Sequence, residues 1–245
     1  MLTFVCWKWK PPTGYRTTFT AEHVRILGRM IARHYHKPHR FACVTDDPSG
    51  LDGIETLPLW KEWASIPNPS GGHNPSCYRR LKLFAPDAGD TFGPRVVSID
   101  LDMVITADIT PLFDRPEDFI IWGESDFPRK QWFNGSLWYL RTGTRPQVYT
   151  RFNPKSSPIE AYRHGGRGSD QAWISHVLGP PKGSAAPTEA VWGKADGIYS
   201  FRKDMYEKGR YELPADARVL VFHGKVKQDS PRALTVAPWI RTHYQ

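Results

Sequence analysis

Apolar residues along the chain occur in two arrangements, as short continuous runs and at intervals of three and four. The runs are typical of buried strands and the intervals of amphipathic helices. Strands are predicted at 2–7, 41–44, 55–59, 95–100, 119–122, 137–140 and 218–222. Helices are predicted at 20–36, 77–84 and 169–178, and the tail beyond Gln228 is predicted to be irregular. Because strands alternate with helices, the pattern predicts an α/β protein with a mainly parallel sheet.

The clearest helical signal lies between residues 20 and 36. Val24, Leu27, Met30 and Ile31 fall on one face, and Pro38 stops the helix. By contrast, residues 61–76 are rich in Pro, Gly, Ser and Asn and predict a long loop, which in a compact domain is more often functional than idle.

Composition fits one globular domain. The chain has 245 residues, 40% of them apolar and 24% charged, which is enough for a full core. The longest apolar runs fall well short of a membrane-spanning helix, and the first residues lack a secretory signal pattern. Cys6, Cys43 and Cys77 are too widely spaced for a disulfide framework. We therefore expect reduced thiols, a cytoplasmic location and a single domain over 1–245.

The chain is basic, with 33 Lys and Arg against 25 Asp and Glu and a net charge of +8. Such a charge attracts nucleic acid, phosphorylated small molecules or an acidic membrane surface. The basic residues are scattered, so a simple solubility bias explains the charge equally well.

An acidic tripeptide carries the main chemical signal. Asp100-Leu101-Asp102 follows the apolar strand at 95–100 without a break. Open α/β sheets bind ligands at the carboxyl ends of their strands, and two carboxylates at this spacing can converge on one hard cation. The alternative is that both are strand-end caps or ion-pair partners.

Several further short blocks resemble, in order and spacing, those of GT-A-fold glycosyltransferases near the glycogenin-like retaining family. The blocks are the opening strand, Tyr78–Leu81, Val97–Asp102, Phe133–Ser136, Ser169–Gln171 and Phe222–Lys227. The resemblance implies a single GT-A (Rossmann-like) domain with a mixed, mainly parallel central sheet flanked by helices. It implies a nucleotide-sugar-binding half at 1–105, an acceptor-binding half at 106–228 and a tail at 229–245. The stretches 61–76 and 179–196 have no match.

The resemblance also implies roles for these residues. Asp100 and Asp102, flanking Leu101, would hold Mn²⁺ or Mg²⁺ on the diphosphate of a UDP-sugar, where the cation stabilises the charge of the leaving phosphate. Arg80 would contact the donor phosphate or sugar, although a solvated helix residue is the alternative. Asn134 would bond sugar hydroxyls, although Asn-Gly is also a turn signal.

The reacting carbon would be faced by Asp170 and Gln171. Asp170 is alternatively a helix cap together with Ser169. Asp126 and Glu124 are further candidates, with Asp170, for a stabilising or nucleophilic carboxylate. No residue stands out as a general base, as expected if the leaving phosphate takes the acceptor proton.

The C-terminal block departs from the family pattern. The family's metal-binding histidine aligns with Val221, whereas His223 directly precedes Gly224. Positions 221 and 223 of a strand point to the same side, so His223 can still reach the metal. Gly224 and Leu101 are further donor-binding candidates, and Lys225 and Lys227 are predicted neighbours of the phosphates.

The nucleobase is expected at the first strand and at the turn after the second. Cys6, Trp7 and Asp46 are donor-binding candidates there by position. An aromatic ring at this place can flank a uracil, although Trp7 is alternatively a core residue.

The leading hypothesis is a metal-dependent glycosyltransferase that moves a sugar from a UDP-sugar to an acceptor hydroxyl, with the retention of configuration that the resemblance implies. The acceptor, whether glycan, lipid-linked sugar or nucleic acid, is left open, and loops 61–76 and 153–168 are where it would dock. Alternatives are a DNA-modifying sugar transferase, a non-catalytic nucleotide-sugar-binding protein, and a metal-dependent phosphohydrolase or nucleotidyltransferase. The last needs more clustered carboxylates than Asp100, Asp102 and Asp108 supply.

Overall fold

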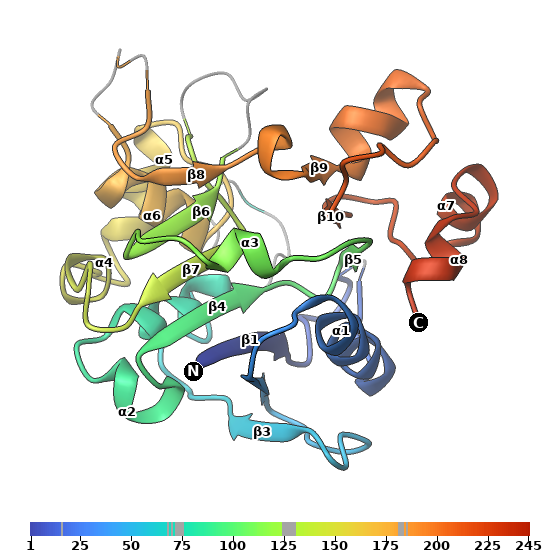
Figure 1. Ribbon diagram of the computed structural model, residues 1–245. Coiled ribbons are helices and arrows are strands. Elements are labelled where there is room, and N and C mark those ends of the chain that lie inside the picture. Colours follow the sequence, from blue (N-terminus) through green and yellow to red (C-terminus); the bar gives the residue numbers. More distant parts are fainter. Residues whose placement is uncertain are drawn as a thin grey trace.

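A seven-strand mixed sheet forms the centre of the protein in this computed structural model (Figure 1). The structure describes residues 1–245 except 16, 68, 70, 72–75, 124–130, 181–183 and 185. In spatial order the strands are β3 (Glu55–Pro58), β2 (His39–Thr45), β1 (Leu2–Lys8), β4 (Arg95–Ile99), β7 (Asn134–Arg141), β6 (Phe119–Trp122) and β8 (Ala190–Trp192). Within this sheet, over the residues that the structure describes, only the pairings of β7 with β4 and with β6 are antiparallel. The predicted mixed, mainly parallel sheet is therefore confirmed.

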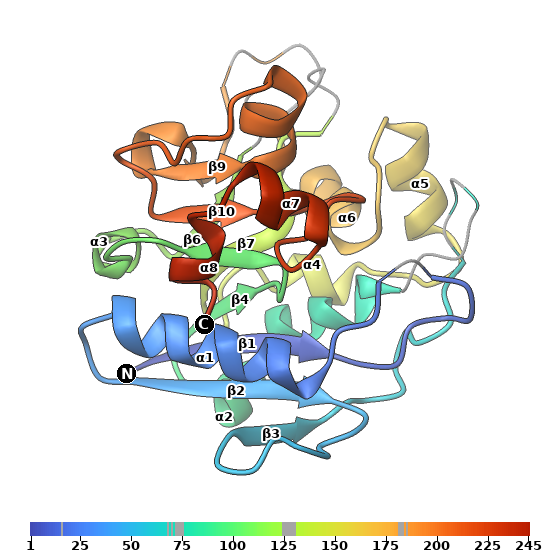
Figure 2. The same ribbon diagram turned by 90° about the vertical axis from the view of Figure 1, so that its right-hand side faces the viewer.

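Apolar side chains cover both faces of this sheet. Successive residues of β1 point to opposite sides, so Phe4 and Cys6 join one buried cluster while Val5 and Trp7 join the other. Helix α1 (Ala21–His34) supplies its four predicted apolar residues to the first cluster, and it lies across β1 and β2 in Figure 2. The second cluster is covered by the 3₁₀-helix η1 (Cys77–Phe84) and by α6 (Asp170–Leu178).

A small second sheet joins the middle of the chain to its C-terminal part. It has the order β5 (Met103–Ile105), β10 (Val219–Val221) and β9 (Ile198–Ser200), with β5 antiparallel to β10. Because β5 starts directly after the acidic tripeptide, this pairing places residues 222–230 beside it. The N–H of Phe222 donates to the carbonyl of Asp102 at 2.8 Å.

The remaining helices are short. They are α2 (Ala88–Phe92), α3 (Thr110–Phe113), α4 (Gln147–Thr150), α5 (Ser157–Arg163), the 3₁₀ turns Lys194–Asp196 and Tyr206–Lys208, the π-helix Phe201–Met205, α7 (Pro231–Val236) and α8 (Ile240–His243). None of the helices in the described part of the chain has the length and apolar character needed to cross a bilayer.

One expectation about local structure is wrong, and one alternative interpretation is excluded. The tail is not irregular, because Ser230 caps α7 by accepting a hydrogen bond from the N–H of Ala233, and Pro231 occupies its first turn. The Asn134–Gly135 pair is not a turn but the start of β7, since this segment pairs with β6 and packs against a buried charged cluster.

Candidate functional site

The acidic tripeptide lies at the carboxyl end of β4, as predicted from the strand that precedes it. Leu101 is 2% exposed and packs into the core, which anchors the turn. The backbone N–H of Asp100 donates to the carbonyl of Ser136 at 2.9 Å, so β7 fixes the turn from the other side. Asp100 is half-buried and Asp102 is buried, and both carboxylates belong to one short turn at the sheet edge.

A buried guanidinium joins Asp100 to the predicted Asp-Gln pair. Arg80 of η1 forms an ion pair with Asp100 and a second one with Asp170, where Nε lies 2.7 Å from Oδ2. The side chains of Arg80 and Asp170 are only 6% and 2% exposed. Arg80 is therefore not a solvated helix residue, and Asp170 uses its Oδ2 for this pair. Burial raises the pKa of Asp100 to about 6, against the opposing charge of Arg80.

Gly135 lets β7 pass close to this cluster. A Cβ at this position would lie 2.9 Å from Nη2 of Arg80 and 3.3 Å from Oδ2 of Asp170. The N–H of Gly135 donates to Oε1 of Gln171 at 3.2 Å. The side-chain oxygen of the neighbouring Asn134 accepts a hydrogen bond from the N–H of Ser136 at 2.9 Å. A glycine inside a strand is typical of such a close approach.

The second aspartate is paired with a lysine of the C-terminal segment. Nζ of Lys227 forms an ion pair with Oδ2 of Asp102 and donates to the carbonyl of Phe222 at 3.2 Å. Oδ1 of Asp102 is buried and has no hydrogen-bond partner among the residues described here. Lys227, predicted to be a phosphate neighbour, thus lies directly on the acidic turn.

His223 lies beside the small sheet. Its Nε2 is 2.7 Å from Oγ of Ser200, and its ring centroid is 5.7 Å from that of Trp122. Burial, together with the positive charge of Arg202, lowers the pKa of His223 to about 4. The imidazole is therefore neutral at physiological pH, the form that binds metals. Next to it, Gly224 has a φ of +106°, which turns the chain into residues 225–230, the basic segment that carries Lys225 and Lys227. A metal-ligand role for His223 stays a prediction.

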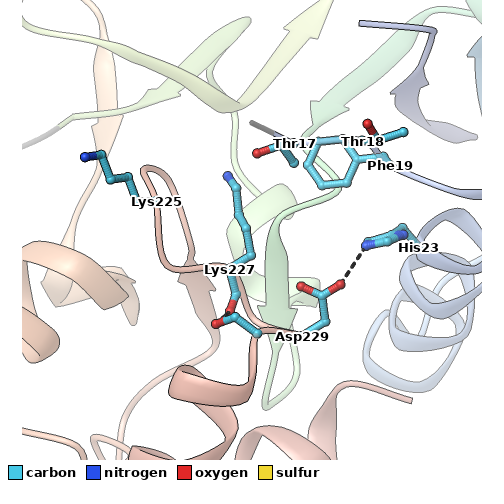
Figure 3. Close-up of a pocket in the computed structure, with 8 residues that line it drawn as sticks. Thr17, Thr18, Phe19, His23, Lys225, Lys227 and Asp229 are labelled. Atoms are coloured by element: carbon cyan, nitrogen blue, oxygen red, sulfur yellow. Dashed lines mark hydrogen bonds and ion pairs between the residues drawn. The ribbon is translucent and has the colours of Figure 1, made fainter. Parts of the chain in front are cut away.

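A pocket of about 490 Å³ opens beside Lys227 (Figure 3). Its walls come from the loop before α1, the first turn of α1 and the basic segment. The lining residues are Thr17, Thr18, Phe19, His23, Lys225, Lys227, Asp229 and Ser230. His23 and Asp229 close one side, with Nε2 3.0 Å from Oδ2. In Figure 3 the side chain of Lys227 lies between those of Lys225 and Phe19. No sequence motif marks the threonines, the phenylalanine or the histidine, so these residues were missed.

At the ends of β1 and β2, the position expected for the base, Cys6 and Trp7 are enclosed, whereas Asp46 is exposed. Cys6 is fully buried, and Trp7 is 6% exposed with its indole N–H donating to Oγ of Ser98 at 2.9 Å. Asp46 accepts a hydrogen bond from the N–H of Lys10.

Trp9, which is only partly buried, offers an accessible aromatic ring at this edge. The guanidinium of Arg79 lies 5.8 Å from the centroid of this ring. Trp9 is the first residue after β1, so the strand pattern that pointed to Trp7 did not predict it. Donor-binding roles for Cys6, Trp7 and Asp46 stay predictions.

Other candidates lie outside this cluster or outside the description. Asp126 and Glu124 fall in 124–130, which lies outside the described residues. Part of the 61–76 loop also lies outside them. Across the described ranges, no three His, Cys, Asp or Glu side chains gather into a group that could hold a metal ion.

A seven-strand sheet with one reversed strand, a small second sheet and an acidic turn between them define the GT-A fold. The chain matches the crystal structure of the galactosyltransferase LgtC in complex with donor and acceptor sugar analogues, with a TM-score of 0.61. At 12% identity the match covers 99% of this chain and 96% of LgtC. A Q189E active-site mutant of LgtC gives a TM-score of 0.58.

The glycosyltransferase GlyE of Streptococcus pneumoniae TIGR4 also matches, with a TM-score of 0.58 and 13% identity, over 94% of this chain and 57% of GlyE. No family model matches the chain, and no curated protein matches its sequence. The structural likeness confirms the predicted GT-A fold.

Proposed function

We propose that this protein is a glycosyltransferase that moves a sugar from a UDP-sugar to an acceptor hydroxyl. One observation carries the proposal: Asp100, Asp102, Asp170 and Lys227 converge at one sheet edge although they are spread over more than half of the chain. In an open α/β sheet this edge is where ligands bind. The division into a donor half at 1–105 and an acceptor half at 106–228 is part of the same proposal.

The acidic turn fits a divalent cation. Oδ1 of Asp102 is a buried acceptor without a hydrogen bond from any described residue. The two carboxylates are close, since burial and then the negative charge of Asp102 raise the pKa of Asp100. Mg²⁺-like ions are commonly held by one or two carboxylates plus substrate phosphates, so a third protein ligand is not required. When bound, Mn²⁺ or Mg²⁺ would supply stabilisation of the charge on the departing diphosphate.

The residues around the turn bind and orient the donor. Lys225 and Lys227 provide charge-assisted hydrogen bonds for the diphosphate, next to the hydroxyls of Thr17 and Thr18 in the pocket wall. Trp9 offers a ring on which a pyrimidine can stack.

Two residues at the start of α6 face the sugar. Arg80 holds Asp170 and the N–H of Gly135 holds Gln171, and the two side chains would supply a stabilising carboxylate and a hydrogen-bonding amide. Retention of configuration belongs to this proposal, and the acceptor proton passes to the leaving phosphate.

A second candidate is a nucleotide-sugar-binding protein without catalysis. Both aspartates are engaged in ion pairs, and the histidine at the C-terminal block is displaced by two positions. Such a protein would bind UDP-sugars without consuming them. A DNA-modifying transferase rests only on the net charge of +8.

A screen of UDP-sugars with Mn²⁺, measuring release of UDP, tests the proposal. We expect one donor to be consumed, and Asp102→Asn to abolish this consumption. Asp108→Asn is the matched control, since Asp108 accepts a hydrogen bond from Thr110 at the start of α3, away from the turn. Metal-dependent binding without UDP release would favour the non-catalytic candidate, and failure to bind any UDP-sugar would contradict both.

A further inference from the structure

We propose that Lys227 is a resident cation on Asp102 that a divalent metal ion must displace, and that a nucleoside diphosphate draws the lysine away. Release of this one side chain would then add to the positive cooperativity between metal and nucleotide. The inference rests on the proposed function and adds to it an order of events within the site.

Lys227 occupies one of the two carboxylate oxygens of Asp102, and a metal on Asp102 would lie beside its ammonium. Its ammonium forms an ion pair with Oδ2 of Asp102, and the two side chains are only 16% and 10% exposed. The lysine also donates to the carbonyl of Phe222 at 3.2 Å, while the N–H of Phe222 donates to the carbonyl of Asp102 at 2.8 Å. The basic segment is thus fastened to the acidic turn through both side chain and backbone.

A divalent cation on Oδ1 and an ammonium on Oδ2 of the same buried carboxylate repel each other. Because both partners are largely withdrawn from water, separating them without a substitute costs far more than breaking an exposed pair. The lysine therefore leaves only when another anion receives it. In the absence of nucleotide, we expect a metal ion to compete poorly for Asp102.

The pocket beside Lys227 provides a place for that anion. Lys225 and Lys227 both line it, and Nζ of Lys227 lies 5.9 Å from the ring centroid of Phe19 on the opposite wall. A lysine has a flexible four-carbon stem, so its ammonium can swing from the carboxylate into the pocket with little backbone movement. A diphosphate bound there would recruit the ammonium and leave both oxygens of Asp102 for the metal.

Arg80 cannot play this part on the other aspartate. Its guanidinium is held by Asp100 and Asp170 together and its side chain is only 6% exposed, so it stays in place when ligands arrive. The exchange is therefore confined to Asp102.

The coupling can be measured without any catalytic assay. Mn²⁺ binding is followed by the electron paramagnetic resonance signal of the free ion, with and without UDP, and is corrected for the Mn²⁺–UDP complex in solution. For the unaltered protein we expect UDP to tighten Mn²⁺ binding by about tenfold or more, within the usual range of coupling between sites. For Lys227→Met we expect tighter Mn²⁺ binding in the absence of UDP and a smaller effect of UDP.

Two further variants test whether the effect on Mn²⁺ binding depends on the charge at position 227 and on the position of that charge in the pocket. Lys227→Arg keeps the cation on Asp102 and should keep weak Mn²⁺ binding without UDP. Lys225→Met removes a positive charge from the same pocket but not from the carboxylate, so Mn²⁺ binding without UDP should not change. Should Lys227→Met fail to fold, as judged by circular dichroism, Lys227→Gln gives the same comparison.

The outcomes separate the two proposals. Unchanged or weaker Mn²⁺ binding by the neutral Lys227 variants would overturn this inference and leave the proposed function standing. Equal tightening by Lys225→Met would also overturn it, because the effect would then be one of general charge. If the unaltered protein bound neither Mn²⁺ nor UDP, both proposals would fall.

Discussion

Replacing Arg80 with methionine removes the guanidinium that pairs with both Asp100 and Asp170. The three side chains meet from η1, β4 and α6, and the side chain of Asp170 is only 2% exposed. Methionine fills a similar volume but leaves a buried carboxylate without a counter-charge. Breaking a buried pair in this way costs about 3–5 kcal/mol, because the remaining charge stays in a poorly solvated place. We expect the free energy of unfolding to fall by this amount.

Thermal and urea unfolding followed by circular dichroism measure the effect. For a chain of this length each 1 kcal/mol shifts Tm by about 2–4 °C, so the expected loss is about 6–20 °C. Arg29→Met is the matched control, since Arg29 pairs with Glu22 at a surface where both side chains are about half exposed. That exposed pair is worth about 1 kcal/mol or less.

A second substitution tests whether the unpaired carboxylate causes the loss of stability. Asp170→Asn in the Arg80→Met background removes the stranded charge and should restore part of the lost stability. A buried carboxylate without a counter-charge is protonated more easily. The loss of unfolding free energy in Arg80→Met, relative to the unaltered protein, should therefore become smaller as the pH falls from about 7 to about 5. A deficit as small as that of Arg29→Met, or one that Asp170→Asn deepens at neutral pH, would refute this account of the cluster.

Three other outcomes are expected. Gly135→Ala should lower the unfolding free energy by about 1–3 kcal/mol from overpacking, measured in urea against Gly193→Ala, whose Cβ meets no atom within 4 Å. Trp9→Ala should weaken UDP binding in calorimetry by about 1–3 kcal/mol if the base stacks there, and unchanged affinity would exclude that position. The hydrogen bond from His23 lowers the pKa of Asp229, so its stabilisation is complete above the unfolded pKa of about 3.9 and is lost as pH falls through the folded value. Asp229→Asn should therefore flatten the acid end of the stability profile, and an unaltered profile would count against the pair.

Elements with a strong local pattern could be predicted from the sequence. The apolar run of β4 ends in Asp100 without a break, and the spacing of apolar residues in α1 gave its buried face. The three-residue strands β5, β9 and β10 have too few positions for a periodicity, and their pairing depends on partners far along the chain. Only β10 was anticipated, because its run is flanked by further apolar residues.

The candidate site divides in the same way. Asp100, Asp102 and Lys227 could be predicted as site residues, because each lies in a short sequence block that resembles the glycosyltransferase pattern. The contact of Arg80 with Asp170 joins residues 90 positions apart, and no local pattern reports it. The pocket wall at Thr17, Thr18 and Phe19 likewise exists only because β5 and β10 bring residues 222–230 to the loop before α1.

Calorimetric titration of UDP into the protein, with and without Mn²⁺, tests most directly whether the turn after β4 holds a cation on a nucleotide. The account predicts that Mn²⁺ tightens UDP binding to the unaltered protein and has no such effect on Asp102→Asn, while Asp108→Asn behaves as the unaltered protein does. The same dependence on Mn²⁺ in Asp102→Asn as in the unaltered protein would contradict it.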